Sequence, residues 1–244
     1  MRRFWLLVVA LVAVGCGAAP ENQVVVSTAA SLHLAFREIE VAFEAANPGT
    51  DVVLNVAGSS SLRDQILEGA PVDAYASADM FNMNAVADAG LVDGSPQVFA
   101  TNRMIIAVPT GNPGGVLGIA DLAREDLLVG LCAEGVPCGD LARRVLAAAG
   151  VNAEIDTNES DVRALVTKIE AAELDAGLVY SSDVEAAGGS LSGIAIDDED
   201  NVVTEYPIGA LVGSPNPEGA AAFVEFVLSS RGRSILLDFG FGTP

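Results

Sequence analysis

The chain has 244 residues, 51% of them hydrophobic, and carries 33 acidic against 12 basic side chains, for a formal net charge of −21. A chain of this length and composition buries a large core in one or two domains. So acidic a surface repels nucleic acid and anionic lipid headgroups, which argues against both as binding partners.

Residues 1–15 are predicted to be a signal peptide, because two arginines precede an apolar run. That run is too short for a transmembrane helix. Its end, Ala13-Val14-Gly15-Cys16, resembles a bacterial lipobox, in which the cysteine becomes the lipidated first residue. A simple secretory signal is the alternative. We therefore expect 16–23 to be a tether, lipidated at Cys16, on an extracytoplasmic protein at the outer face of the bacterial cell membrane or in the periplasm.

Strand and helix patterns alternate through the first part of the mature chain, which predicts an α/β organisation. Runs of apolar and β-branched residues mark the strands, and apolar residues at helical spacing mark the helices. The predicted strands cover 24–29, 51–58 and 73–77, and the predicted helices cover 31–46, 60–68 and 80–89.

The alternation restarts after a break, which predicts a second lobe. A buried strand at 104–108 ends in the turn-rich segment PTGNPGG, and strand and helix patterns recur from 120 to 180. Residues 202–213 have the pattern of a returning strand, and 217–237 that of one long closing helix. We expect two α/β lobes joined by two crossing strands, with 24–104 and 206–244 in lobe I and 105–205 in lobe II.

Residues 188–200 end in four consecutive acidic residues, Asp197 to Asp200. Calcium loops place their acidic ligands in the alternating pattern D-x-D-x-DG, which this segment lacks. A solvated loop is therefore predicted here rather than a calcium site.

Four apolar strands run directly into helices whose first residues are small or hydroxylated. The first N–H groups of a helix have no partner inside it and carry a partial positive charge, so helix starts bind anions. Several such starts around one cleft would hold an oxyanion without arginine, lysine or a metal. The junctions lie at Ser31, at Ser59 to Ser61, at Cys138 and Gly139, and at Tyr180 to Asp183; a further helix opens at Asp161-Val162-Arg163.

Each junction also has an ordinary structural interpretation. Ser31 alone is equally an N-cap, and Ser160 would serve as one for the helix at Asp161. The three consecutive serines exceed what one cap needs, which favours a ligand. Tyr180 is either a cleft residue or a core tyrosine with a local partner. His33, the only histidine, is expected to be solvated or packed.

With Cys16 assigned to lipid, Cys132 and Cys138 remain. They are close in sequence and lie in an oxidising compartment, so a disulfide is expected. A redox or metal-binding thiol pair is the alternative, although the spacing is not CxxC and no histidine lies nearby.

Catalytic motifs are missing from the sequence. It contains no G-x-S-x-G, Walker or HExxH motif, and a single histidine to activate a nucleophile. Nothing indicates that the acidic residues Asp73 and Asp79 face each other. We expect no enzymatic activity, no catalytic residue and no cofactor.

Taken together, the chain resembles the substrate-binding lipoproteins of molybdate ABC transporters, which have the type II periplasmic binding-protein fold. The resemblance covers nearly the whole mature chain, and its order and spacing make it specific. Its carriers are AASL at 29–32, GSSSL at 58–62, GAPVD at 69–73, ASAD at 76–79, VPCG at 136–139, ESDVR at 159–163 and GLVYSSD at 177–183.

This resemblance implies a monomer that captures molybdate or tungstate and delivers it to the membrane permease of an ABC transporter. It implies that hydroxyl and N–H groups of Ser31 and Ser59, N–H groups of Cys138 and Val162, and the Tyr180 hydroxyl hold the oxyanion. Many relatives carry alanine where this chain has Cys138, a change that keeps the backbone donor. The alternatives are a receptor for another ligand, such as sulfate, phosphate or ferric iron, and a catalytic or adhesive lipoprotein on this fold.

Overall fold

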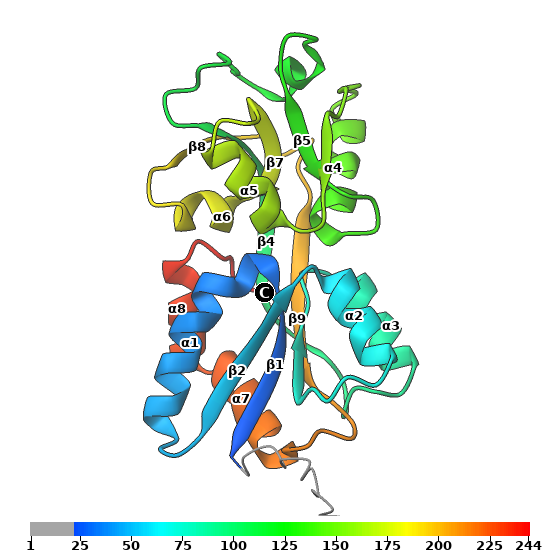
Figure 1. Ribbon diagram of the computed structural model, residues 1–244, viewed down its shortest axis with the longest axis vertical. Helices are drawn as coiled ribbons and strands as arrows, with labels where there is room; N and C mark the ends of the chain where they lie inside the picture. The colour runs from blue at the N-terminus through cyan, green and yellow to red at the C-terminus, as the bar shows by residue number, and fades with distance from the viewer. Residues whose placement is uncertain (1–21) are drawn as a thin grey trace, which may run out of the picture.

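The computed structural model describes residues 22–244, so the predicted leader, the lipidation site Cys16 and residues up to 21 of the tether lie outside it. The described chain alternates strands and helices, most of them short (Figure 1). The strands are β1 (Gln23–Ala29), β2 (Asp51–Ala57), β3 (Ala74–Ala76), β4 (Gln97–Pro109), β5 (Val129–Cys132), β6 (Thr157–Glu159), β7 (Ala176–Tyr180), β8 (Leu191–Ile194) and β9 (Val203–Ala210). The helices are η1 (Ala30–Leu32), α1 (His33–Ala46), α2 (Ser59–Leu67), α3 (Met80–Asp88), η2 (Ile119–Ala123), α4 (Pro137–Ala148), α5 (Val162–Glu170), α6 (Ser181–Ala186), α7 (Pro217–Leu228) and α8 (Ser230–Asp238).

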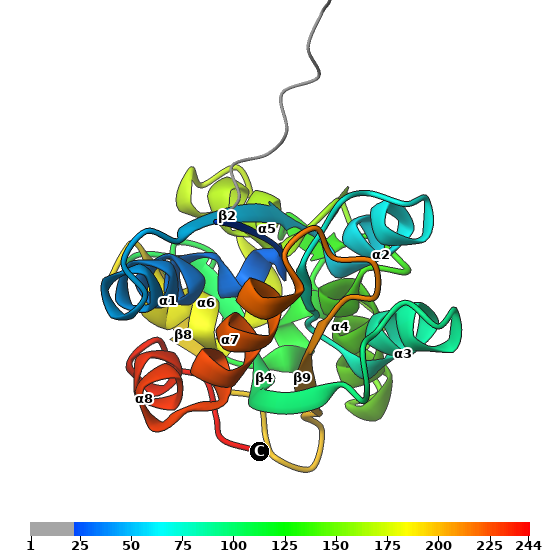
Figure 2. The ribbon, with the colours of Figure 1, turned by 90° about the horizontal axis from the view of Figure 1, so that it is seen from below.

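The strands pair in the order β2-β1-β3-β9-β4-β7-β5-β6, with β8 added on β4. Figure 1 shows two lobes along this path. Lobe I holds β1, β2, β3, α1, α2, α3, α7 and α8, and lobe II holds β5 to β8 and α4 to α6. Seen from below, α1 and α8 lie on one flank of the lobe I strands, and α2 and α3 lie on the other (Figure 2). The α/β two-lobed fold expected from the sequence is confirmed.

Two strands, β4 and β9, connect the lobes (Figure 1). The first half of β4 pairs with β9 as far as Arg103, opposite Val203. From Met104, which faces Tyr180, β4 pairs with β7 and β8 in lobe II. The strand predicted at 104–108 is therefore only the lobe II half of a longer strand that begins at Gln97.

An asparagine side chain continues the pairing where the sheet passes between the lobes. Asn201 lies just before β9, and its amide donates to the Met104 carbonyl at 2.8 Å while its carbonyl oxygen accepts from the Met104 N–H at 3.2 Å. A side-chain amide thus replaces a strand partner at this crossing. Both backbone polar groups of Met104 are thus satisfied by this one side chain.

The long closing helix predicted at 217–237 is wrong, because the structure breaks it into α7 and α8 at Ser229. Ser229 has extended backbone angles, and its hydroxyl accepts from the Gly232 N–H at 3.2 Å to begin α8. Hydroxyl caps of this kind compete with helix continuation. The prediction failed because apolar residues keep their helical spacing on both sides of Ser229, which hides the end of α7 and the start of α8.

The predicted solvated loop at 188–200 is wrong in part, because residues 191–194 form β8 and pair with the end of β4. The acidic residues after it are in a turn, where Asp198 forms an ion pair with Arg103. Across residues 22–244, no group of three or more acidic, histidine or cysteine side chains gathers as a metal site. Within the same range, no helix has the length and hydropathy to cross a membrane.

The main hydrophobic core runs through both lobes along the connecting strands, where Met104, Ile106 and Ile208 are fully buried. Tilted and edge-on aromatic contacts extend it: Phe36 packs on Phe99, and Phe99 on Tyr206 at ring-centroid distances of 5.9 and 6.4 Å. The connecting strands are therefore a packed part of the core.

Candidate functional site

A small cavity lies between the lobes and is lined equally from both. Lobe I contributes Ala29, Ala30, Ser31, Gly58, Ser59 and Ala78, and lobe II contributes Val136, Pro137, Cys138, Asp161, Val162 and Tyr180. The structure thus brings together all five residues that the sequence singled out as ligands: Ser31, Ser59, Cys138, Val162 and Tyr180. Ser60 and Ser61, which had suggested spare ligand hydroxyls, do not line it.

The cavity leaves about 10 Å³ for the centre of a water-sized sphere. Pockets for drug-sized molecules measure roughly 300 to 1,000 Å³. A site this small suits an ion of a few atoms and excludes a sugar or an amino acid. The lobes therefore leave only a small space between them at this point.

On the lobe I side, Ser59 begins α2 and is nearly fully buried. Its hydroxyl accepts from the Ala78 N–H at 3.0 Å, and its carbonyl accepts from the Tyr75 hydroxyl at 2.9 Å. A serine hydroxyl that accepts one bond still has its own proton to donate. No side chain caps the start of α2, so its first N–H groups remain available to the cavity.

The Ser31 hydroxyl lies in the short turn η1 after β1 and makes no helix cap, contrary to the ordinary interpretation. It shares a hydrogen bond of 2.9 Å with the hydroxyl of Tyr206, a fully buried residue of β9. When Tyr206 donates, the Ser31 proton is free for a ligand. Sequence reasoning missed Tyr206, whose only signal was an aromatic residue in the returning strand.

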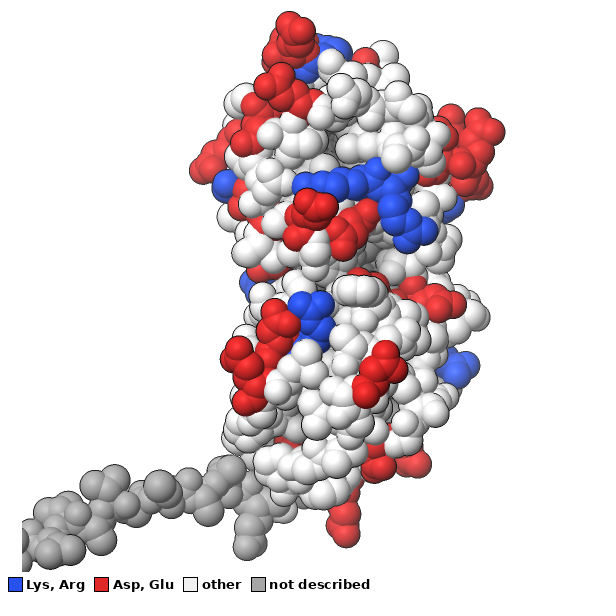
Figure 3. Space-filling view, turned by 90° about the vertical axis from the view of Figure 1, so that its right-hand side faces the viewer, with Lys and Arg blue, Asp and Glu red and all other residues white. Residues whose placement is uncertain are grey.

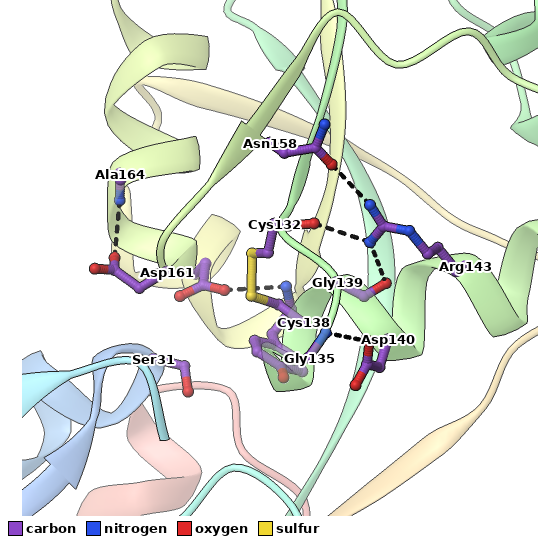
Figure 4. Close-up of a disulfide and its surroundings, with 12 residues drawn as sticks. Ser31, Cys132, Gly135, Cys138, Gly139, Asp140, Arg143, Asn158, Asp161 and Ala164 are labelled. Atoms are coloured by element: carbon purple, nitrogen blue, oxygen red, sulfur yellow. Dashed lines mark hydrogen bonds between the residues drawn. A yellow bond between two sulfur atoms is a disulfide. The ribbon is translucent and has the colours of Figure 1, made fainter. Parts of the chain in front are cut away.

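On the lobe II side, the disulfide between Cys132 and Cys138 ties the end of β5 to the first turn of α4 (Figure 4). Arg143 donates to the carbonyls of Cys132 and Gly139, both at 2.9 Å, and the Asp140 carboxylate accepts from Gly135 N–H at 2.8 Å. Pro137 occupies the first turn of α4, and no side chain caps it. The loop that presents the Cys138 N–H is therefore held by the disulfide and by the hydrogen bonds of Arg143 and Asp140.

The second lobe II helix start is α5. Its cap is Asp161, whose Oδ1 accepts from the Ala164 N–H at 3.0 Å, so the Ser160 cap considered from the sequence is wrong. Val162 follows as the first helical residue and is buried against the cavity. The Asp161 side chain accepts only from Ala164, and the first N–H of a helix has no acceptor inside it, so the N–H of Val162 is left for a ligand.

Tyr180 ends β7, and its hydroxyl is buried in the cavity wall, where it makes no well-formed hydrogen bond within residues 22–244. The nearby Tyr206 hydroxyl interacts with it only weakly, because its own short bond goes to Ser31. Burial, together with Tyr206 and Asp183, raises the pKa of Tyr180 well above its ordinary value, so it remains a neutral donor. An unpartnered buried hydroxyl costs about 1 to 3 kcal/mol. A solute that accepts its proton would remove that cost.

Asp183 lies three residues after Tyr180 at the start of α6 and accepts from the Tyr180 N–H at 3.0 Å. Its desolvation by burial raises its pKa to about 8, even though the Tyr180 hydrogen bond acts to lower it. At neutral pH the group is therefore protonated. A carboxyl beside the cavity thus adds no negative charge near a bound anion.

The two acidic residues considered for catalysis serve the fold. Asp73 accepts from the N–H groups of Val25 at 2.7 Å and Asn216 at 2.8 Å. Asp79 caps α3 by accepting from the Asn82 N–H at 2.9 Å. Asp73 thus links β1 to the segment before α7, and Asp79 serves its own helix start.

Two wider grooves flank the cavity. One, of about 240 Å³, shares Ala30 and Ser31 with it and is lined by His33 and Arg163 from opposite lobes. The other, of about 470 Å³, lies between the starts of α3 and α4 over the connecting strands. On the face seen in Figure 3, acidic and basic side chains mix above and below the waist between the lobes.

A family model described as "Bacterial extracellular solute-binding protein" matches residues 24–242. The Molybdate-binding protein ModA of Mycobacterium tuberculosis H37Rv is 40% identical over 223 residues, which cover 91% of this chain and 85% of that protein. The periplasmic molybdate-binding protein of Azotobacter vinelandii superposes with a TM-score of 0.80 at 18% identity, covering 91% and 99%. The sulfate-binding protein SubI of M. tuberculosis H37Rv superposes with a TM-score of 0.76 at 15% identity, covering 90% and 86%.

Proposed function

Because the chain belongs to the family of bacterial extracellular solute-binding proteins, we propose that it captures molybdate in the cavity between its lobes. The family resemblance found in the sequence is thereby confirmed, and the proteins it matches bind solutes rather than catalyse reactions. The observation that carries the proposal is the Tyr180 hydroxyl, buried and unpartnered among the described residues, in a cavity ringed by helix starts.

The proposed ligands are the hydroxyl and N–H groups of Ser31 and Ser59, the N–H groups of Cys138 and Val162, and the Tyr180 hydroxyl. All are neutral donors, which suits an anion in a protein whose net charge is −21. Hydrogen bonds to a charged group contribute roughly 1.5 to 3 kcal/mol each. A handful of them supports a micromolar to nanomolar dissociation constant, about −8 to −12 kcal/mol, after ordering and desolvation costs.

Selection among tetrahedral dianions would rest on size, since sulfate and molybdate offer the same four oxygens. Tungstate is nearly the size of molybdate, so we propose that it binds as well. Sulfate is the second candidate, because the fold is shared with a sulfate-binding protein. Ferric iron is disfavoured, because the cavity wall supplies one tyrosine, Tyr180, and one carboxylate, Asp161.

We further propose that residues 24–104 with 206–244 and residues 105–205 move as two bodies about β4 and β9. Solute contacts made from both lobes would favour the closed state, which a membrane permease of an ABC transporter would then receive. The protein would act as a monomer outside the cytoplasm, tethered by lipid on Cys16.

Thermal unfolding of the chain without its proposed leader tests the function directly. The probes are molybdate, tungstate, sulfate, phosphate and ferric citrate. Ligand at 1,000 times its dissociation constant adds about 4 kcal/mol, which raises the midpoint by roughly 8 to 16 °C for a chain this size. A rise with molybdate and tungstate supports the proposal. A higher midpoint with sulfate alone would make sulfate, not molybdate, the solute. An unchanged midpoint with every anion would overturn the receptor function.

Ser59→Ala and Ser61→Ala form a matched pair for the site itself. Both lie in the first turn of α2, but only Ser59 lines the cavity. Ser59→Ala should weaken molybdate binding by about 1 to 3 kcal/mol, and Ser61→Ala should leave it unchanged. Equal affinities in the two variants would contradict the assignment of Ser59.

A further inference from the structure

Gly58 lies between β2 and α2, immediately before the proposed ligand Ser59. Its backbone angles are φ −60° and ψ 139°, a conformation that every residue type adopts readily. It is the N-cap of α2, a position that accepts glycine but where asparagine, aspartate and serine rank higher, so capping does not require a glycine. Neither backbone geometry nor capping therefore accounts for a glycine here.

The opposite lobe does account for it. A Cβ atom on Gly58 would lie 2.9 Å from the carbonyl oxygen of Ser160 and 3.7 Å from side-chain atoms of Asp161 and Val136. All three residues belong to lobe II, on the far side of the cavity. A Cβ at 2.9 Å overlaps an oxygen, and the obstacle is backbone, which no rotamer change relieves. With any other residue at this position, the lobes would have to stand further apart.

We propose that the missing side chain of Gly58 sets how far the lobes close and thereby the affinity and fit of the anion cavity. The contact point is well placed for this. Ser59 follows Gly58 directly, while Val136 and Asp161 are the N-cap residues of α4 and α5, whose starts carry Cys138 and Val162. The inference rests on the proposed function, because it concerns the same cavity.

A small separation at this contact affects many donors at once. Hydrogen bonds from N–H groups span about 2.7 to 3.2 Å, and a contact of about 3.6 Å no longer counts as one. An anion held from lobe I would then lose its bonds to the lobe II helix starts together. Closure would no longer be favoured by contacts from both lobes.

The test compares Gly58→Ala with Gly118→Ala. Gly118 also has an extended backbone, with φ −174°, but a Cβ there meets nothing within 4 Å. Without anion, both variants should unfold at the wild-type temperature or slightly above it, because alanine restricts the unfolded chain. With molybdate, the dissociation constant of Gly58→Ala should rise by about tenfold or more, as expected from losing at least one charged hydrogen bond, while Gly118→Ala stays at the wild-type value.

Small-angle scattering supplies a readout that a purely local defect would not change. Molybdate should reduce the radius of gyration of the wild type and of Gly118→Ala, and reduce that of Gly58→Ala by less. Gly58→Ser is a second variant: its hydroxyl caps α2, so it should unfold no earlier than wild type and still bind more weakly.

The outcomes separate the two proposals. If wild type responds to none of the anions, the proposed function fails. If wild type binds molybdate and Gly58→Ala binds it equally tightly, only the closure role of Gly58 is overturned. Weak binding accompanied by a large loss of anion-free stability in both Gly58 variants would also overturn it, since the glycine would then serve the fold of lobe I.

Discussion

The hydroxyl oxygens of Ser31 and Tyr206 lie 2.9 Å apart, joining the first turn after β1 to a connecting strand 175 residues later. Tyr206 thereby fixes a proposed ligand from the strand about which the lobes would move. It also packs edge-on against Tyr180 and Phe241, with ring centroids 5.9 and 5.4 Å away. The tyrosine that lines the cavity and the tyrosine that bonds Ser31 are thus packed against each other.

Tyr206→Phe should weaken molybdate binding by about 1 kcal/mol, because the Ser31 hydroxyl loses the partner that orients it. The aromatic packing remains, so the unfolding midpoint without anion should change little. Isothermal titration calorimetry measures the first quantity and differential scanning calorimetry the second. An unchanged affinity would show that the Ser31 hydroxyl does not depend on its bond to Tyr206 to contact the anion.

Tyr180→Phe should change stability and binding in opposite directions. Removing a buried hydroxyl that has no partner among the described residues should stabilise the anion-free protein by up to about 1 kcal/mol. Molybdate should bind about 1.5 to 3 kcal/mol more weakly, because a charged hydrogen bond is lost. Denaturant unfolding measures the change in stability, and calorimetry on the same preparation measures the change in affinity. A loss of stability without anion would mean that the hydroxyl has a structural partner.

Asp183→Asn should flatten the pH dependence of stability. The unfolded chain ionises this carboxyl near pH 4, whereas the folded protein, with its pKa raised to about 8, keeps the proton. Between these values the folded state binds more protons, so stability falls as pH rises, by at most about 1.4 kcal/mol per pH unit. Asparagine cannot ionise and still accepts from the Tyr180 N–H. Midpoints measured from pH 5 to 8.5 should therefore diverge in favour of the variant as pH rises, and parallel curves would contradict the burial of a neutral carboxyl.

Replacing both Cys132 and Cys138 by serine should lower the free energy of unfolding by about 2 to 2.5 kcal/mol, the chain-entropy value for so short a loop. The midpoint should fall by roughly 4 to 10 °C. The affinity for molybdate should change much less, because the proposed donor is the N–H of residue 138 and Arg143 still holds the loop. A large loss of affinity would instead assign the disulfide a role in placing that donor.

Arg163→Gln should slow anion capture. Arg163 lines the groove beside the cavity and forms no ion pair within residues 22–244. The Arg163 charge is felt across the groove: after burial, it is the second largest cause that lowers the pKa of His33. The groove also contains the acidic Glu170 and the neutral Asp183, so this arginine is the charge that favours an entering anion there. The association rate at low ionic strength should drop about 2- to 10-fold. Stopped-flow tyrosine fluorescence at low and at 0.5 M salt measures it, and equal rates for both proteins at low salt would exclude steering by Arg163.

The sequence located the junctions well because their signals are local. An apolar strand that gives way to small or hydroxylated residues predicts where a helix starts. The parallel pairing of β1 with β2 and of β5 with β6 and β7 then brings the ends of strands to one edge of each lobe. Ser31, Ser59, Cys138, Val162 and Tyr180 therefore gathered at one cavity. Their role as ligands stays a prediction until binding is measured.

Other features depend on contacts that no local pattern encodes. The Ser31 to Tyr206 hydrogen bond joins segments far apart in sequence. The neutral state of Asp183 depends on its burial in the folded protein, which its local sequence does not reveal. β8 was missed because the chain around it is polar and Gly-rich, and it forms only by adding to the end of β4. The break at Ser229 was missed because apolar spacing alone does not reveal a cap.

The position of β9 has a consequence for the order in which this chain can fold. β9 lies between β3 and β4, so the sheet of lobe I cannot be completed until residues 203–210 arrive, near the end of synthesis and export. The strands of the lobe II sheet all lie between residues 104 and 194, so they can pair before β9 arrives. Although the N-terminal domain of most proteins folds first, here the lobe that contains β1 must wait, with the edges of β3 and β4 unpaired, for the last fifth of the polypeptide.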